Sequence, residues 1–352
     1  MATMREVAAR AGVSIATVSF VVNGSRSVSP ATHRRVTDAM ADLGYTNNVV
    51  ARALASKRTR IVALLFPALE ERLGGIALRM FMSAASRASE LGYHLVLWPS
   101  GETDQDVRDL VSGRLVDGVL VMEVQLHDSR VEALLELGLP FVSMGRTSQN
   151  DRVPFVDMDF EEGVEQALDH LESLGHESVG LVLEDFSASP IVGYGPAART
   201  EEAFRLSAAR RGLRSALVTC GPSAAGGRRA AHDLVAALPD VTGVLIMKDD
   251  ATGGLLSGLA ATGRRVPDDV SVVSLASSTA NGAATEPTLT TLDAPGVEMG
   301  RLAVESLVAR LDAGAGAGAG AGGAGELTQV LLPCVLHVAG SSGPAPGMAA
   351  RG

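Results

Sequence analysis

The sequence has few of the features that mark secreted, membrane or zinc-binding proteins. Its two cysteines, Cys220 and Cys334, are far apart and form no CxxC pair, so neither a disulfide framework nor a zinc site is indicated. The clean apolar run Ile61–Phe66 is much too short to span a bilayer. The first ten residues are charged and lack an apolar signal-peptide core. We therefore expect a cytoplasmic protein that is not associated with membranes.

The motifs of common enzyme classes are also missing. There is no Walker loop, HExxH, GxSxG or GxGxxG after the first strand, and the GYG at Gly193–Gly195 is too short to count. The seven histidines are scattered, and His170 and His176 are poorly spaced for a metal. The sequence predicts no enzyme, no cofactor and no metal site. Two functions remain as alternatives to DNA binding, namely an enzyme and a sugar-transport receptor. Neither is expected to bind DNA in a salt-dependent way.

Charge divides the chain into a basic head and an acidic body. Residues 1–60 contain nine Lys or Arg and three Asp or Glu, a formal charge of +6, which leaves −16 for the remainder. This asymmetry is expected when only the head meets phosphate. The alternative is a solvated basic surface. With 352 residues, 46% of them hydrophobic, the chain has room for two or three domains with cores of their own.

Capping residues predict three short helices in the head. Thr3 and Glu6 form a capping box that opens a helix ending near Ala11. Ser14 caps a second helix, and Ser29, followed by proline, caps a third, over 15–22 and 30–43. Two short helices joined by a glycine turn indicate a helix-turn-helix, whose second helix presents its N-terminal residues to the major groove. The alternative is an ordinary small helical bundle.

The residues of the second helix separate into two faces. Val18, Val21 and Val22 are expected to turn inward. The outward face is expected to carry Ile15, Ala16, Ser19 and Phe20.

The head resembles the DNA-binding head of the LacI/GalR family of bacterial repressors. The stretches EVAARAGVS, TVS-VVNG, VSPAT and LGY all fall at the family spacing. The resemblance implies base reading by Ile15, Ala16 and Phe20. It implies contacts to the DNA backbone, which suit hydroxyls and amides, by Thr3, Ser14, Thr17, Ser19, Asn23, Ser29, Thr32, Tyr45 and Asn48.

Phe20 departs from the family pattern, since many members carry arginine at its place. Arginine binds guanine through two hydrogen bonds, whereas phenylalanine packs on thymine methyl groups. We therefore predict a largely apolar readout on a double-stranded operator whose sequence differs from the usual one.

Residues 47–60 lack strong caps and would form a marginal helix alone. The resemblance implies a hinge that becomes helical on operator DNA, with Leu54 wedged between base steps in the minor groove. The alternative is that Leu54 is a linker residue that packs on the body.

Short apolar runs alternate with helical stretches in the body, which predicts parallel strands in βα units. The expected strands are 61–66, 94–98, 118–122, 141–144, 179–183, 243–247 and 270–275, and the expected helices include 81–91 and 161–176. This order predicts two doubly wound parallel-sheet subdomains with a cleft at the carboxyl ends of the strands.

The body also resembles the family's α/β periplasmic-binding-protein-like core, through stretches such as LPFVSMGR and RRVPDDVSVVS. The resemblance implies an effector-binding and dimerisation domain over 61–342. Its first subdomain would hold about 61–160 and 292–324, and its second about 161–291 and 325–342. Ala313–Gly325, which is low in complexity, is expected to be a flexible insertion, and 343–352 a flexible tail.

Polar residues expected at the family's effector site are partly missing. Gly145 and Thr200 stand where an acid and an arginine are usual, and the loop after 270–275 lacks its acid. The remaining candidates for effector binding are Arg146, Tyr194, Arg199, Lys248 and Asp249, each of which has an alternative as a surface or loop residue. A carbohydrate-related effector is the family default.

Together these features predict an all-α helix-turn-helix head on an α/β core, acting as a sequence-specific transcriptional regulator. We expect a nucleoid-associated repressor that binds a pseudo-palindromic operator as a homodimer or a dimer of dimers. A small-molecule effector in the cleft would shift operator affinity through two-site coupling.

Overall fold

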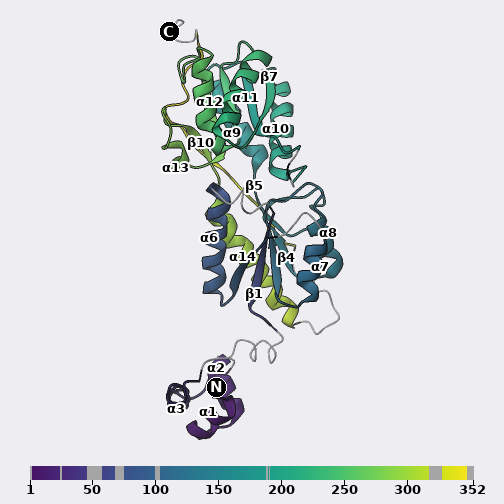
Figure 1. Ribbon diagram of the computed structural model, residues 1–352, viewed down its shortest axis with the longest axis vertical. Helices are drawn as coiled ribbons and strands as arrows, with labels where there is room; N and C mark the ends of the chain where they lie inside the picture. Colours follow the sequence, from purple (N-terminus) through teal and green to yellow (C-terminus); the bar gives the residue numbers. More distant parts are fainter. Residues whose placement is uncertain are drawn as a thin grey trace. The chain divides into compact units, whose positions relative to one another are not determined.

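The computed structural model describes residues 2–23, 26–45, 58–67, 75–99, 104–187, 189, 191–316 and 327–346. The chain forms two compact units, Met1–Thr59 and Arg60–Gly352 (Figure 1). The first unit is all-α and the second holds two sheets covered by helices. The fold class predicted from the sequence is therefore confirmed.

The head contains three helices, α1 (Met4–Ala11), α2 (Ile15–Asn23) and α3 (Pro30–Asp42). Thr3 and Glu6 form the predicted capping box at the start of α1, and Gly12 ends α1 in the left-handed conformation with φ of 64°. The three helices bury a single small core, which contains Val7, Ala8, Ala11, Val18, Val36 and Ala39.

Each half of the second unit contains a six-stranded sheet. The first has the order β11-β5-β4-β3-β1-β2 and is parallel throughout. Its strands are β1 (Ile61–Phe66), β2 (His94–Pro99), β3 (Gly118–Val121), β4 (Phe141–Ser143), β5 (Phe155–Met158) and β11 (Gln329–Leu332).

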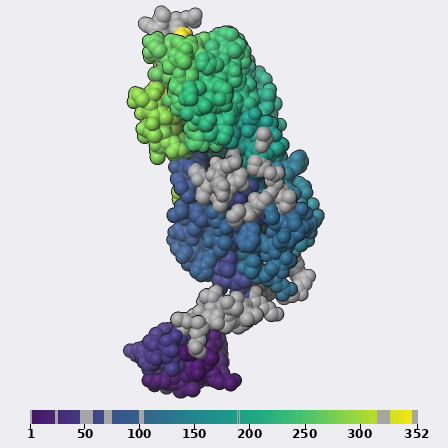
Figure 2. All heavy atoms as spheres, viewed as in Figure 1, coloured from purple at the N-terminus to yellow at the C-terminus, as the bar shows by residue number. Residues whose placement is uncertain are grey.

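The second sheet has the order β12-β10-β9-β8-β6-β7, and only β12 runs antiparallel to its neighbour. Its strands are β6 (Ser178–Glu184), β7 (Arg214–Cys220), β8 (Gly243–Ile246), β9 (Ser271–Ser277), β10 (Thr290–Asp293) and β12 (Val335–His337). We call the parts built on the two sheets the first and second subdomains. They form two lobes, coloured largely blue and largely green in Figure 2.

Helices cover both faces of each sheet, so the central strands are buried on both sides. In the first subdomain α6 (Gly75–Glu90) packs against α14 (Gly296–Gly316), and α7 (Asp104–Ser112) packs against α8 (Ser129–Leu137) (Figure 1). In the second, the packed pairs are α9 (Phe160–Ser173) with α10 (Gly195–Arg211), and α11 (Ala224–Ala237) with α12 (Asp249–Ala261). A short helix, α13 (Thr279–Gly282), follows β9.

All seven strands predicted from apolar runs are present, as β1, β2, β3, β4, β6, β8 and β9. Sequence analysis did not predict the other five, which are β5, β7, β10, β11 and β12. β7 and β11 are edge strands with partly exposed side chains, so neither shows the unbroken apolar run of a buried parallel strand.

The predicted subdomain boundary at residue 325 is wrong for β11. This strand belongs to the first sheet, where it pairs in parallel with β5 and Gln329 lies opposite Phe155. The chain therefore returns to the second subdomain only after β11, and β12 then closes the second sheet. Residues 313–316 of the predicted insertion also differ from expectation, because they continue α14.

The predicted flexible tail is wrong for its first residues, 343–346. The Gly343 N–H donates to Ser271 Oγ at 3.0 Å, and the Gly343 carbonyl accepts a hydrogen bond from His176 Nε2 at 3.0 Å. Ala345 is buried and its N–H donates to the Leu174 carbonyl at 2.8 Å. These bonds hold the segment against the second subdomain.

Candidate DNA-reading surface and effector cleft

The first turn of α2 presents apolar side chains to its surroundings. Ile15 is 45% exposed and Ala16 is exposed, whereas Val18, on the opposite face, is fully buried. Val21 and Val22 pack against the head core, as predicted from the sequence. An exposed isoleucine and alanine on this turn are suited to contact thymine methyl groups in a major groove.

Phe20 is half-buried and lies beside a cation. The guanidinium carbon of Arg26 is 5.9 Å from the centroid of the Phe20 ring, which is within the range of a cation–π contact. The contact places a guanidinium, with its several N–H donors, next to the ring. This arginine was not predicted from the sequence, and its signal was the short distance along the chain from Phe20.

Three of the predicted backbone-contact residues are helix caps. The hydroxyls of Thr3, Ser14 and Ser29 accept backbone N–H bonds from the first turns of α1, α2 and α3. Helix N-termini carry unpaired N–H groups and a positive dipole end, so phosphate binds well there. The starts of α2 and α3 are therefore two positions suited to an anion, whereas at the start of α1 the Glu6 carboxylate already accepts bonds from the Thr3 N–H and hydroxyl.

The structure describes only some of the other residues predicted to contact the DNA backbone. Thr17 and Thr32 bond to the cap hydroxyls of Ser14 and Ser29 at 2.9 Å, and Tyr45 packs against the head core. Ser19 is half-buried. Asn48, Leu54 and the side chain of Asn23 lie outside the described residues.

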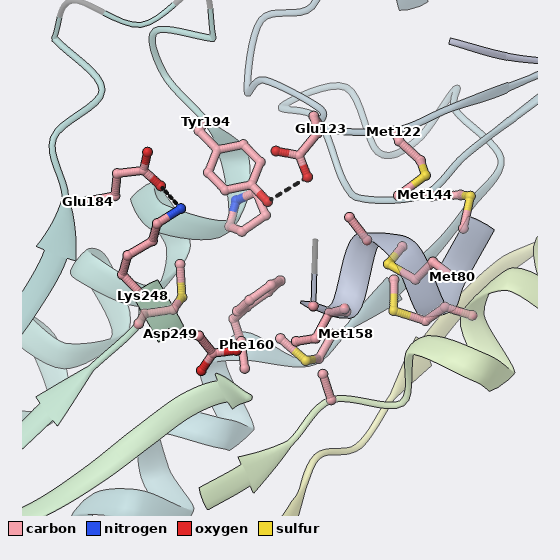
Figure 3. A pocket seen from close by; sticks show the side chains of 18 of the residues that line it. Met80, Met122, Glu123, Met144, Met158, Phe160, Glu184, Tyr194, Lys248 and Asp249 are labelled. Atoms are coloured by element: carbon pink, nitrogen blue, oxygen red, sulfur yellow. Dashed lines mark hydrogen bonds and ion pairs between the residues drawn. The ribbon is translucent and has the colours of Figure 1, made fainter. Parts of the chain in front are cut away.

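A cavity of about 640 Å³ lies between the two subdomains (Figure 3). Parallel strands from both sheets end at it, so the residues at their carboxyl ends face one another across the space. From the first sheet these are Met122, Glu123, Met144, Asp157 and Met158, and from the second Glu184, Met247, Lys248, Ala276 and Ala294.

Methionines line much of this cavity. Six of the eleven methionines in the chain contribute, namely Met80, Met122, Met144, Met158, Met247 and Met299. All except Met247 are almost fully buried, and Phe160 lies among them (Figure 3). Thioether side chains are apolar and adaptable, so this end of the cavity offers an apolar surface that can fit varied shapes.

The polar groups of the cavity gather at its other end (Figure 3). Lys248 Nζ is 3.1 Å from a carboxylate oxygen of Glu184 and 3.4 Å from one of Asp250. Across the space, the Tyr194 hydroxyl donates to Glu123 at 3.4 Å. The Lys248 ammonium therefore already has two carboxylate partners.

Asp249 opens α12 beside Lys248, and its carboxylate accepts hydrogen bonds from Ser277 Oγ and Asn281 Nδ2, each at 2.5 Å. Burial raises the pKa of Asp249 above the usual range of an aspartate, although these bonds oppose the rise. The carboxylate is thus partly buried and bonded to two uncharged donors.

Backbone hydrogen bonds join the subdomains beside the cavity. Gln125 and Tyr194 form an antiparallel bridge, and the Leu126 N–H donates to the Gly193 carbonyl at 3.0 Å. The Gly195 N–H donates to Val124 at 2.9 Å, and a Cβ at Gly195 would lie only 3.1 Å from two backbone oxygens. The chain after β3 and the start of α10 are thereby tied together. We call these bonds the side strap.

Two of the residues that line the cavity have unusual backbone conformations. Glu123 follows β3 and has φ of 53°, and Ala276 lies near the end of β9 and has φ of 49°. Positive φ is uncommon for residues other than glycine and tends to occur at functional sites. The two residues belong to opposite subdomains, so both walls of the cavity show this feature.

The chain was compared with known protein families and structures. Residues 3–48 match the lacI family of bacterial regulatory proteins, and residues 168–341 match a periplasmic binding protein-like domain. The HTH-type transcriptional regulator CelR of Thermobifida fusca is 34% identical over 327 residues, covering 88% of this chain and 92% of CelR. The chain belongs to the LacI family of bacterial regulatory proteins.

Solved structures agree with this assignment. The transcriptional regulator CelR–cellobiose complex is similar over 97% of this chain and all of that chain, with a TM-score of 0.69 and 29% identity. The Lac repressor dimer bound to operator and the anti-inducer ONPF has a TM-score of 0.79 at 24% identity, over 97% of this chain and 99% of that one, which shows the shared fold. As a LacI-family member, the chain is a DNA-binding transcriptional regulator.

Five residues were predicted from the sequence to contact the effector. Three of them, Tyr194, Lys248 and Asp249, line the cavity of this LacI-family protein. Arg146 and Arg199 do not line it. Arg146 donates to Asp157 at 2.9 Å and to Glu161 at 2.5 Å, and is thereby held behind Asp157, which does line the cavity.

Arg199 lies in the same cluster. It donates to the Thr147 carbonyl at 3.0 Å and is 3.7 Å from Glu161. Because Arg199 is on α10 and Thr147 follows β4, this contact is a second link between the subdomains.

Sequence reasoning missed Glu123, Glu184 and the methionines of this LacI-family cleft. Both glutamates follow or end a correctly predicted strand, so the rule that ligands bind at carboxyl ends of parallel strands was the available signal. Among the described residues, no group of three or more His, Cys, Asp or Glu side chains could hold a metal ion, and no helix is long and apolar enough to cross a membrane.

Proposed function

We propose that this LacI-family regulator is a repressor that binds a pseudo-palindromic operator as a homodimer. A small molecule in the cleft would alter its affinity for the operator. The observation that carries the proposal is that one chain combines an exposed apolar turn on α2, flanked by caps suited to phosphate, with a two-walled cavity of about 640 Å³. Two separate sites in one chain are the requirement for coupling between effector and DNA.

The links between the subdomains offer a physical route for this coupling. A molecule in the cavity touches both walls, while the side strap and Arg199 hold the two subdomains together beside it. Closing the walls on a ligand would change the angle between the subdomains about these links. In a dimer, this change would move the two hinge segments toward or away from each other and so shift operator affinity.

An apolar strip on the first subdomain supports the homodimer. Leu78 and Met82, four residues apart on α6, are 42% and 58% exposed, and Val297 at the start of α14 is 60% exposed. Ser83 Oγ donates to the Val297 carbonyl at 2.6 Å, which holds the two helix segments together. Exposed apolar side chains gathered on adjacent helices are typical of an interface with a second protein surface.

For the effector, the relatives favour a carbohydrate-related molecule, because the similar CelR structure is a cellobiose complex. Tyr194, Asn281 and the carboxylates around the cavity could all bond to sugar hydroxyls. Titrating the operator complex with cellobiose tests this class directly. A change in operator affinity at saturating cellobiose would support it, and an unchanged affinity would remove cellobiose as the effector.

The DNA-binding role is tested by selecting duplexes from a random pool and measuring their affinities at two salt concentrations. We expect recovery of a palindromic sequence and a steep fall in affinity with salt, because the head releases counterions from phosphates. The selection is run with and without a pool of metabolites, so that a corepressor requirement is met. Failure to enrich any sequence under both conditions would overturn the proposal.

Phe20→Arg is expected to change the selected sequence. A guanidinium at this position can bond to O6 and N7 of guanine, so guanine should appear at base pairs where the parent protein selects thymine. Each good bidentate contact discriminates by about 1–3 kcal/mol. Repeating the selection measures the change, with Phe20→Leu as a control that keeps an apolar side chain. If Phe20→Arg selects the same sequence as the parent, Phe20 does not face the groove.

Leu54→Ala tests the predicted hinge. Loss of the wedge should weaken binding to the selected operator about tenfold or more, because the kinked operator would no longer gain the contacts that offset unstacking. Binding to random DNA should stay unchanged, because it depends on phosphate contacts. Parallel titrations against both duplexes measure the effect. An equal loss on both would show that Leu54 does not contribute to the specific complex.

A further inference from the structure

The cleft has two chemically different ends. Five methionines from the first subdomain, together with Phe160, make one end apolar and almost dry. The opposite end carries Lys248 and Glu184, and the Asp249 carboxylate lies beside Phe160 (Figure 3). Asp250 of the second subdomain also lines the cavity. A ligand that fills the whole cavity must therefore be apolar at one end and polar at the other.

The charges that line the cavity are mainly negative. Among the described lining residues the acids are Glu123, Asp157, Glu184, Asp249 and Asp250, and the only lysine or arginine is Lys248. The Lys248 ammonium is already within 3.1 Å of Glu184 and 3.4 Å of Asp250. An anionic ligand would bring a further negative charge to this end and would find its cation already engaged.

Among the carboxylates of the cavity, Asp249 would be stabilised most by a cation on the ligand. Its oxygens accept bonds from the uncharged donors Ser277 and Asn281, and it forms no ion pair of 4.0 Å or less with any residue that the structure describes. Arg79 attracts it only over a longer distance. Asp249 is partly buried, and a partly buried carboxylate is costly without a cation close by, so a positive group entering the cavity here would recover part of that cost.

We infer that the effector is an amphipathic cation, with a protonated amine seated near Asp249 and an apolar body lying on the methionine end. The inference rests on the proposed function, because it narrows the chemistry of the molecule that the cleft binds. The flexible thioethers accept an aryl or alkyl body without a fixed shape. A plain neutral sugar would leave this apolar end without a matching surface, whereas an amino sugar with an apolar substituent satisfies both requirements.

Three isosteric probes separate the contribution of the charge from that of the body. They are 4-phenylbutylamine, 4-phenylbutanol and 4-phenylbutyrate, titrated calorimetrically into the full-length protein without DNA. We expect the amine to bind about tenfold more tightly than the alcohol, because its hydrogen bond to a carboxylate is charge-assisted, and the acid to bind most weakly. Equal affinity of the three compounds, preference for the acid, or no binding of the amine would overturn the inference.

The apolar end is tested by removing the ring from the probe. Butylamine keeps the ammonium group but buries far less apolar surface, so its affinity should fall about tenfold or more below that of 4-phenylbutylamine. Cellobiose is titrated as the polar, uncharged comparison. Equal affinities of the two amines, or binding of cellobiose with neither amine bound, would show that the methionine end does not accept the ligand body.

Asp249→Asn and Asp268→Asn are matched variants, one inside the cavity and one on the surface of the same subdomain. Asp249→Asn should reduce the affinity for 4-phenylbutylamine to that for 4-phenylbutanol and leave the alcohol unchanged, which also shows that the cavity is intact. Asp268 is 59% exposed and does not line the cavity, so Asp268→Asn should change neither affinity more than about threefold. An equal loss of amine and alcohol binding in Asp249→Asn would show that Asp249 only shapes the cavity.

The proposed function and this inference fail in different ways. Salt-dependent binding to a selected operator by a protein that does not bind the amine would retain the regulator and reject the amphipathic cation. Amine binding by a protein that selects no DNA sequence would retain the amphipathic cation as the ligand and reject the regulator.

Discussion

Gly254→Ala is expected to lower the free energy of unfolding by about 3 kcal/mol or more. Gly254 lies on α12 where this helix packs against α11, and an added Cβ would be 1.9 Å from the Ala224 carbonyl oxygen. Gly227 on α11 is in the reciprocal position, since its Cβ would be 1.9 Å from the Ala251 carbonyl oxygen. These contacts are with backbone, so two helices would have to separate to admit one methyl group.

Gly253→Ala is the matched control, one residue away on the same helix. Gly253 is exposed, and a Cβ there would meet nothing within 4 Å. Alanine favours the helix over glycine, so this variant should be more stable by about 0.5–1 kcal/mol. Urea unfolding followed by circular dichroism measures both changes. Similar free energies of unfolding for the two variants would contradict the close approach of α11 and α12.

Arg130→Met is the second substitution with a large expected effect, a loss of about 3–5 kcal/mol in the free energy of unfolding. The side chains of Arg130 and Asp128 are 2% and 1% exposed and are joined by two hydrogen bonds, of 2.9 and 2.7 Å. Arg130 also donates to the carbonyls of Met122 and Glu123, each at 3.1 Å. Without the guanidinium, the Asp128 carboxylate stays buried with no compensating charge, and that penalty dominates.

Two further variants identify the cause of this loss. Combining Arg130→Met with Asp128→Asn removes the buried charge while leaving a residue that can still cap α8, so the double variant should be more stable than the single one. Arg205→Met breaks an exposed ion pair with Glu201 and should cost less than about 1 kcal/mol. The urea midpoints of the three proteins measure these differences in stability. A double variant less stable than Arg130→Met would show that the buried charge is not the cause.

The most predictable parts of the fold were those determined by nearby residues. The capping box of Thr3 and Glu6 acts within one helical turn, and the run Ile61–Phe66 is apolar because β1 is buried on both faces. One of the strands missed, β11, pairs with a segment far away in the chain. β11 has alternating exposed and half-buried residues and is a strand only because β5 lies beside it.

The cleft was predicted in the same partial way. Lys248 and Asp249 line the cavity because they follow a buried strand, β8, at the edge of the sheet where the cleft opens, and their contact with an effector stays a prediction. Arg146 also follows a strand, yet Asp157 and Glu161 bind its side chain and keep it from the cavity. Pairing of side chains across subdomains leaves no pattern in a single sequence, and neither does the gathering of methionines from six separate segments.

The late pairing of β11 has a consequence for how the protein is made. On the ribosome, β5 emerges long before Gln329, which lies opposite Phe155 in the finished sheet. α6 must likewise wait for α14, whose Gly300 lies so close to Met80 that a Cβ would be 2.2 Å from the Met80 carbonyl oxygen. The nascent first subdomain therefore keeps an open strand edge and an uncovered apolar helix face while the whole second sheet except β12 is synthesised. Premature termination after β5 and before α14 would release a chain with both surfaces exposed, so such translation errors in this protein should lead to aggregation rather than to a separately folded domain.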